Sequence, residues 1–303
     1  MARIALKIDV DTDRGTAEGV PRLIEALERA NARGTFLFSL GPDNTGRALR
    51  RVFRRGFLGK VRRTSVLRHY GLKTLLYGTL LPGPHIGRRR AAEMRLAAQH
   101  GFEAGIHSYD HVKWQDRVAH ASPQWTRHEM SQAQAQFTDV FGVPASAHGA
   151  AGWQLNAAVP QLEQLMGFRY ASDTRGTAPF LPVVDGVACR VPQIPTTLPT
   201  LDELIGLYPS EDEVAGYLLA RTEQHTDHVF TLHAELEGGQ LLGLFQRLLR
   251  GWQSQGYRLC DLAEVHAQLN LAHLPRRTIE SGEVRGRSGT LAVEGAVVAR
   301  LER

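Results

Sequence analysis

Two histidines four residues apart, His107 and His111, are the side chains in this sequence best suited to bind a metal. They follow a short apolar run, and a spacing of four returns both side chains to one face of the chain. Two neutral imidazoles on one face supply half of a site for a zinc-like divalent cation. The missing ligand should be a carboxylate, and Asp9 and Asp11 stand at the end of an apolar stretch near the N-terminus.

The elements that must position these residues follow from the hydrophobic pattern, which predicts strands alternating with helices. Apolar runs predict strands at 3–8, 35–40, 103–106, 145–149, 169–172, 228–232 and 258–260. Apolar residues at helical spacing predict helices at 20–32, 91–100, 125–141, 155–166, 211–224, 240–254 and 262–269. Such alternation is typical of an α/β protein with a mostly parallel sheet or barrel.

The polar residues that could do chemistry fall at the C-terminal ends of these predicted strands. They are Asp9, Asp11, His107, Asp173 and His233. In α/β barrels the active site is built at this edge of the sheet. We therefore expect these side chains, from four separate strands, to meet in one site.

Composition places the chain among ordinary globular proteins. Its 303 residues, 43% of them apolar, can bury one large core or two smaller ones. Two cysteines make no disulfide framework, so a reducing compartment is expected. We find no secretory signal pattern, and no apolar run approaches the roughly 18–20 residues of a spanning helix. The sequence thus predicts neither export nor a membrane span.

Basic charge is concentrated between Asp43 and Glu93, a window that holds thirteen Lys and Arg and no acidic residue. Outside it acidic residues outnumber basic ones, so an anionic partner is expected for this segment alone. A nucleic acid is one alternative, because clustered basic charge suffices to bind a phosphate backbone. The apolar residues of the segment, including Phe53 and Phe57, instead favour amphipathic helices on an anionic membrane surface. We expect no nucleic acid, and no obligate protein partner is evident.

The two aspartates, the run His107-Ser108-Tyr109-Asp110-His111 and the strand end Leu232-His233 together resemble the polysaccharide deacetylase family, carbohydrate esterase family four. The resemblance implies an irregular (β/α) barrel over residues 1–270. A basic amphipathic helical insertion at 44–90 would face a membrane. Residues 271–303 would form a C-terminal tail, as a peripheral hairpin or partly disordered.

The same resemblance implies one divalent metal ion (zinc, manganese or cobalt) bound by Asp11, His107 and His111. It makes Asp9 the general base and His233 the general acid, and we expect Asp173 to keep His233 charged and oriented. The arginine that usually follows the third strand of the family is missing here. Arg175 is the candidate to hold the base in its place.

Further stretches resemble a narrower branch of the family, which removes a formyl group from an amino sugar carried on undecaprenyl phosphate for lipid A modification. These stretches are 14–21, 41–44, 193–200 and His233-Ala234-Glu235. The resemblance implies a lipid-linked sugar substrate and a peripheral position on the cytoplasmic face of the bacterial inner membrane. Substrate contacts are expected from Arg14, Tyr109, Trp153 and Glu235. An N-deacetylase of another sugar remains the alternative within the same reaction class.

Overall fold

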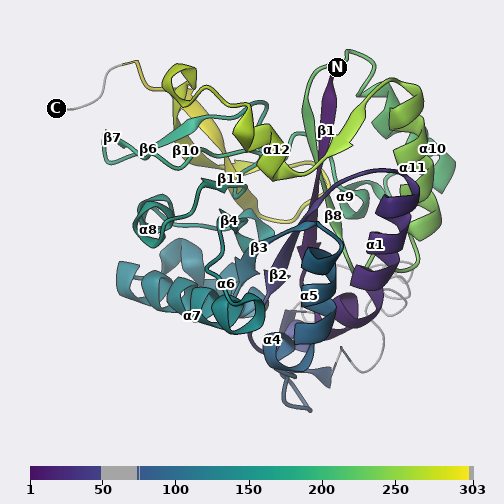
Figure 1. Ribbon diagram of the computed structural model, residues 1–303. Coiled ribbons are helices and arrows are strands. Elements are labelled where there is room, and N and C mark those ends of the chain that lie inside the picture. The colour runs from purple at the N-terminus through teal and green to yellow at the C-terminus, as the bar shows by residue number, and fades with distance from the viewer. Residues whose placement is uncertain (49–73, 75, 300–303) are drawn as a thin grey trace.

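A seven-stranded parallel sheet forms the centre of the part of the chain that the structure describes (Figure 1). The computed structural model describes residues 1–48, 74 and 76–299. The strand order is β5-β4-β3-β2-β1-β8, and β9 pairs with β1 beyond this path. The strands are β1 (Arg3–Val10), β2 (Thr35–Ser39), β3 (Glu103–Ser108), β4 (Ala147–His148), β5 (Tyr170–Ala171), β8 (His228–His233) and β9 (Arg258–Cys260).

The sheet curls into an irregular barrel, and the extended segment 193–198 bridges its two edge strands. Ile194 N donates to Ala171 O of β5 at 2.7 Å, and Thr197 N donates to Val229 O of β8 at 3.1 Å. Pro195, which has no N–H to donate, lies between these two donors. The predicted α/β barrel is therefore confirmed, and a proline-containing segment completes its wall.

Helices flank the sheet and supply the other half of the core (Figure 1). They are α1 (Val20–Arg29), α4 (Ile86–Arg89), α5 (Ala91–Gln99), α6 (His111–Arg117), α7 (Pro123–Phe141), α8 (Ala158–Met166), α9 (Leu201–Leu204), α10 (Glu211–Ala220), α11 (Leu242–Ser254) and α12 (Leu262–Ala267). Most of the predicted helices agree with these bounds to within a turn. The short helices α6 and α9, which have no long apolar pattern, were not predicted.

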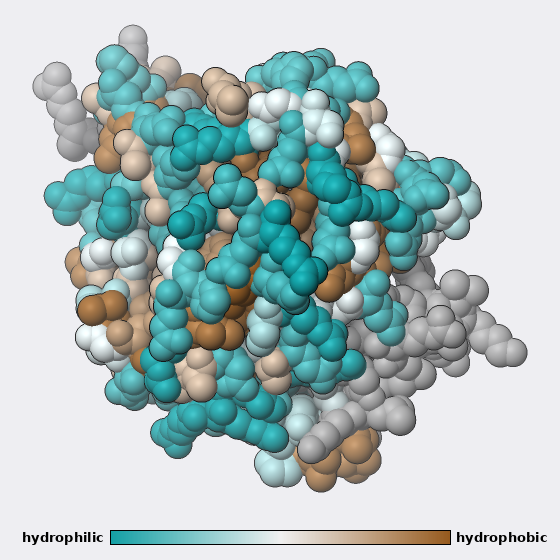
Figure 2. Space-filling model, turned by 45° about the vertical axis from the view of Figure 1, so that its right-hand side comes forward, coloured by the Kyte–Doolittle hydropathy of each residue, from teal (hydrophilic) through white to brown (hydrophobic). Residues whose placement is uncertain are grey.

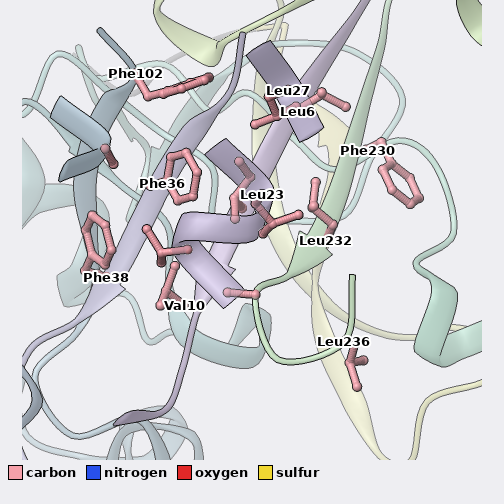
Figure 3. Packing of buried hydrophobic residues seen from close by; sticks show 14 of the residues in the cluster. Leu6, Val10, Leu23, Leu27, Phe36, Phe38, Phe102, Phe230, Leu232 and Leu236 are labelled. Carbon is pink, nitrogen blue, oxygen red and sulfur yellow. The ribbon is translucent and has the colours of Figure 1, made fainter. Parts of the chain in front are cut away.

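The strand that carries Asp9 and leads into Asp11, β1, is held by the packing of α1 against it. Leu23 and Leu27 of α1 are fully buried with Leu6 and Val10 of β1, and Figure 3 shows these side chains gathered between helix and strands. Burying one such leucine contributes about 2 kcal/mol. The register of β1 then sets Asp9 level with His233 of β8. A base candidate and an acid candidate thus stand side by side on a rigid sheet.

The C-terminal hairpin and two short strands from the middle of the chain form a second sheet, with the order β11-β10-β6-β7. Its strands are β6 (Leu181–Val184), β7 (Val187–Ala188), β10 (Arg276–Glu283) and β11 (Thr290–Val297). Arg175 N donates to Ala292 O at 2.9 Å, and Glu294 N donates to Arg175 O at 2.8 Å. A hairpin after Pro275 was predicted, but this hairpin is not peripheral, because it pairs with the segment beside the barrel.

Most of the predicted membrane-facing insertion, residues 49–73 and 75, lies outside the described residues, so its helices stay a prediction. Beside it, the Leu80 side chain is 79% exposed, and Leu76 and Leu81 are also exposed. Figure 2 shows hydrophobic surface next to the grey residues at the lower edge of the molecule. Among the described helices, none is both long enough and apolar enough to cross a membrane.

Candidate metal centre

Three side chains, from two strand ends separated by β2 and from one helix start, converge at the C-terminal edge of the sheet. Asp11 follows β1, His107 belongs to β3, and His111 begins α6. The His107 Nε2 atom lies 3.2 Å from Asp11 Oδ1, and His111 Nε2 lies 3.4 Å from Asp11 Oδ2. One ligand atom from each residue lies within 4.8 Å of the other two. The predicted metal ligands are thus brought together.

The hydrogen bonds around His107 show that this set fits a cation. His107 Nδ1 lies 2.6 Å from Gly149 O and donates to it, so Nε2 is left with a lone pair that faces Asp11. Asp11 Oδ1 is buried and has no hydrogen-bond partner among the described residues. A lone pair and a carboxylate oxygen repel each other at this distance unless a cation lies between them. A divalent metal ion satisfies both atoms.

The electrostatics of the site favour the protonation states that a metal needs. Burial by itself would raise the pKa of Asp11, but His111 and His107 lower it well below its ordinary value. Burial lowers the pKa of His111, which keeps the imidazole neutral. An ionised carboxylate and a neutral imidazole are the forms in which these groups bind metal.

Asp9 lies beside the three ligands and faces a buried lysine. It is 2% exposed, and its Oδ1 atom has no hydrogen-bond partner among the described residues. Lys7 Nζ lies 3.7 Å from Asp9 Oδ2 and donates to Ser172 O at 2.7 Å. A lysine two positions before an aspartate in a strand shares its face, and this spacing was a readable signal that we missed. Lys7 therefore occupies the position that we predicted for Arg175.

The prediction that Arg175 holds the base is wrong. Its Nη1 atom donates to Glu203 Oε1 at 2.5 Å, and its Nη2 atom donates to Leu198 O at 3.1 Å. The guanidinium also lies 5.0 Å from the centre of the Trp153 ring. Arg175 thus joins the second sheet to the barrel and does not contact Asp9.

His233 stands at the end of β8, and its imidazole pairs with the carboxylate of Asp202 of α9. The Nδ1 atom lies 3.8 Å from Asp202 Oδ1. Burial lowers the pKa of His233, but the charges of Asp202 and Asp11 outweigh it and raise the pKa to about 9. An imidazole that holds its proton at neutral pH can act as a general acid.

The predicted pairing of Asp173 with His233 is also wrong. Asp173 lies 3.1 Å from His148 Nδ1 and accepts a hydrogen bond from Ala150 N at 2.6 Å. Asp202 was missed because α9 has only four residues and no strand precedes it. The Thr200–Glu203 capping box that begins α9 was a readable signal of that helix.

Of the four predicted substrate contacts, only Trp153 lines the central cavity. Tyr109 instead meets His85, with 3.3 Å between its hydroxyl and the imidazole, and Arg14 pairs with Glu18. Trp153 has φ +52°, a strained conformation for a large residue, which places its ring in the wall.

Glu235 lies beneath the metal loop. Its Oε1 atom accepts hydrogen bonds from Asp11 N at 2.9 Å and Thr12 N at 2.7 Å. Burial and the nearby charge of Asp11 raise the pKa of Glu235 to about 8. Glu235 therefore positions the ligand loop and is not a substrate contact.

The ligands, Asp9 and His233 open into one cavity of about 150 Å³. Its other lining residues include some that the sequence did not indicate: Gln115, Asp202 and Arg287. The metal ligands and a charged imidazole therefore line the same cavity. This arrangement suits hydrolysis of a small polar bond, because a base and an acid reach the same cavity as the metal ligands.

Comparison with known proteins agrees with this geometry. The family model for polysaccharide deacetylase matches residues 8–171. A relative from Shewanella sediminis (strain HAW-EB3), named "Probable 4-deoxy-4-formamido-L-arabinose-phosphoundecaprenol deformylase ArnD", is 34% identical, covering 98% of this chain and 96% of that protein. A protein of the same name from Wigglesworthia glossinidia brevipalpis is 29% identical, covering 94% and 99%.

Solved structures show the same fold. The crystal structure of a probable polysaccharide deacetylase from Pseudomonas aeruginosa PAO1 superposes with a TM-score of 0.61 at 15% identity, covering 90% of this chain and 92% of that one. The family match extends from the end of β1 through β5 and includes all three ligands, and the full-length relatives extend beyond it. The chain therefore belongs to the polysaccharide deacetylase family and is a hydrolase of an amide bond.

Proposed function

We propose that this protein is a metal-dependent deformylase of a lipid-linked sugar. Its substrate would be 4-deoxy-4-formamido-L-arabinose carried on undecaprenyl phosphate, and its products formate and the free 4-amino sugar lipid used to modify lipid A. The observation that carries the proposal is an Asp–His–His set that shares one cavity with His233 and with Asp9, whose Oδ1 atom has no hydrogen-bond partner among the described residues. Similarity over nearly the whole chain to proteins named as this deformylase supports the substrate.

Asp11, His107 and His111 would hold a divalent cation, and zinc, manganese and cobalt all suit two imidazoles and a carboxylate. A bound cation supplies Lewis acidity toward the amide oxygen and the attacking water. Asp9 accepts the proton of that water as its oxygen bonds to the formyl carbon. Glu235 keeps the ligand loop in place from below.

His233 completes the reaction by protonating the sugar nitrogen. An amine leaves poorly unless it is protonated, so the C–N bond breaks as the imidazolium gives up its proton. The original water oxygen leaves in formate, and the nitrogen leaves as the free amine. The raised pKa of His233 keeps this proton available at neutral pH.

Mass spectrometry of the products tests the substrate. The protein should convert the undecaprenyl phosphate-linked formamido sugar to the amino sugar lipid, and the matched acetamido sugar lipid should react far more slowly. Faster release of acetate than of formate would instead support the alternative, an N-deacetylase.

We also propose that the protein docks on an anionic membrane through the basic segment 44–90. Thr45 and Ala48, which begin this segment, line the cavity, so a lipid held there would place its sugar near the ligands. Exposed leucines and the basic residues Arg88 and Arg89 lie in the C-terminal part of the same segment. Basic side chains near an anionic leaflet contribute roughly 1 kcal/mol each. The expected position is the cytoplasmic face of the bacterial inner membrane.

Co-sedimentation with anionic vesicles tests this docking. The double variant Phe53→Asp with Phe57→Asp should remain in solution while keeping the parental metal content. The matched control, Val143→Asp with Leu165→Asp, changes exposed apolar residues elsewhere and should still sediment. Equal sedimentation of both double variants, or binding to duplex DNA but not to vesicles, would contradict the proposal.

A further inference from the structure

The C-terminal hairpin brings an arginine into the cavity from far along the chain. Strand β11 is fixed to the barrel because Arg175 exchanges two backbone hydrogen bonds with Ala292 and Glu294. The turn between β10 and β11 then presses against α9. Gly286, with φ +91°, lies so close that an added Cβ would stand 2.4 Å from Glu203 O. Only glycine permits this approach, and it brings the next residue, Arg287, to the cavity wall.

The Arg287 guanidinium engages both acids of α9. Its Nε atom donates to Glu203 Oε1 at 3.0 Å, and Nη2 lies 3.0 Å from Asp202 Oδ2. The guanidinium also packs over the Trp153 ring, 4.8 Å from its centre. A charge-assisted contact to a largely buried carboxylate fixes both its position and its ionised state.

Asp202 in turn faces the acid of the proposed reaction. One carboxylate oxygen, Oδ2, contacts Arg287, while Oδ1 accepts a hydrogen bond from Thr200 Oγ1 at 2.5 Å and lies 3.8 Å from His233 Nδ1. The His233 Nδ1 atom is buried and has no hydrogen-bond partner among the described residues. Asp202 is therefore the group that can orient this imidazole, and its own orientation is set by Arg287 and Thr200.

We propose that Arg287 is a positioning residue for the reaction. It holds Asp202 against Nδ1 of His233, so that Nε2 presents its proton to the leaving nitrogen. The inference rests on the proposed function and extends it to a hairpin that lies outside the matched family span of 8–171. The hairpin thus belongs to the catalytic apparatus, and the chain needs it for proton transfer.

A double-variant cycle on formate release tests this role. Arg287→Gln should lower kcat by about 10- to 100-fold, the usual cost of losing a group that orients a reacting residue, with KM and metal content close to parental. Arg287→Lys should recover part of the loss. The matched control Arg285→Gln changes an exposed arginine of the same turn and should behave like the parent.

The decisive variant is Arg287→Gln combined with His233→Ala. If Arg287 acts through His233, the double variant is no slower than His233→Ala alone. A further loss of the same size in that background, or a loss of metal in Arg287→Gln, would overturn the inference. Failure of the parental protein to release formate would instead overturn the proposed function itself.

Discussion

Two clusters of histidine and carboxylate lie at the C-terminal edge of the same sheet, and they differ in how their charges are compensated. One consists of Asp11, His107 and His111, and we call it the open cluster. The other consists of His148, Glu163 and Asp173, and we call it the closed cluster. In each, one ligand atom per residue lies within 4.8 Å of the other two. By residue type and proximity, both could hold a metal.

The closed cluster satisfies its own charges. His148 Nδ1 lies 2.7 Å from Glu163 Oε1 and 3.1 Å from Asp173 Oδ1, and all three side chains are at most 2% exposed. Burial lowers the pKa of His148, but Asp173 and Glu163 raise it to about 10, while burial raises that of Glu163. The imidazole nitrogen Nδ1 of His148 contacts both carboxyl groups, so the charged imidazole compensates their charge without a cation.

The charges of the open cluster are not compensated within the cluster. Its imidazole lone pair and carboxylate oxygens face one another across a cavity, and the His107 proton points away, to Gly149 O. The two clusters contain the same kinds of residue. The direction in which the imidazole lone pairs and protons point, more than residue identity, distinguishes the metal site from the buried ion pair. The closed cluster still contributes to the site, because Asp173 binds Ala150 N and so holds the loop that contains Gly149.

The largest expected effect is the loss of metal, and it should occur in variants of the open cluster but not of the closed cluster. Asp11→Ala, His107→Ala and His111→Ala should each lose both the metal and formate release, because each removes one of three protein ligands. His148→Gln should keep the metal at parental stoichiometry. Elemental analysis of purified protein measures this directly. A variant of the closed cluster that lost metal while an open-cluster variant kept it would reverse our assignment.

Next in size is the effect of the two proton-transfer residues of the open cluster's cavity. Asp9→Asn and His233→Ala should each slow formate release by about 10²–10⁴-fold, the usual contribution of a general base or acid. Both should bind metal like the parent, because neither is a ligand in our account. If both lost their metal, Asp9 and His233 would have to be counted as ligands.

The third effect is on stability, and it belongs to the closed cluster. Removing one partner of a buried ion pair costs about 3–5 kcal/mol, so His148→Gln should unfold at lower denaturant concentration. The folded-state pKa of His148, about 10, lies above its ordinary 6.5, so its stabilisation is complete below pH 6.5 and lost as pH rises toward 10. The pKa of Asp173 is lowered from 3.8, so its share is complete above that pH.

Urea unfolding of the parent and His148→Gln at several pH values measures this difference. It should be greatest between about pH 4 and 6.5 and should shrink at pH 9. Thr138→Gln, a change on the exposed surface of α7, serves as a control with little effect. A difference that grew with rising pH would mean that His148 is neutral in the folded protein.

The sequence predicted the sheet and the open cluster because both depend on local signals. Apolar runs marked the strands, and strand ends marked Asp9, Asp11, His107 and His233. The partners of those residues could not be predicted in the same way. Asp202 lies on a four-residue helix and Arg287 on a hairpin turn, and only the closing of the barrel brings them to His233.

Asp173 shows most clearly that the sequence pattern does not predict the partner of a side chain. It follows a strand, as the other site residues do, yet its side chain turns to His148 and Gln193. Which neighbour a strand-end carboxylate meets depends on how the two flanking loops fold, and strand periodicity carries no information about that choice. The same holds for Glu235, whose position under the metal loop follows from the tight approach of Gly15.

Removal and return of metal tests the central claim most directly. The purified protein is exhaustively chelated, then supplied with zinc, manganese or cobalt, and formate release from the undecaprenyl phosphate-linked formamido sugar is followed by mass spectrometry. The account predicts no release from the chelated parent, recovery with at least one of these ions, and no recovery in His111→Ala. Full activity in the metal-free parent would contradict it.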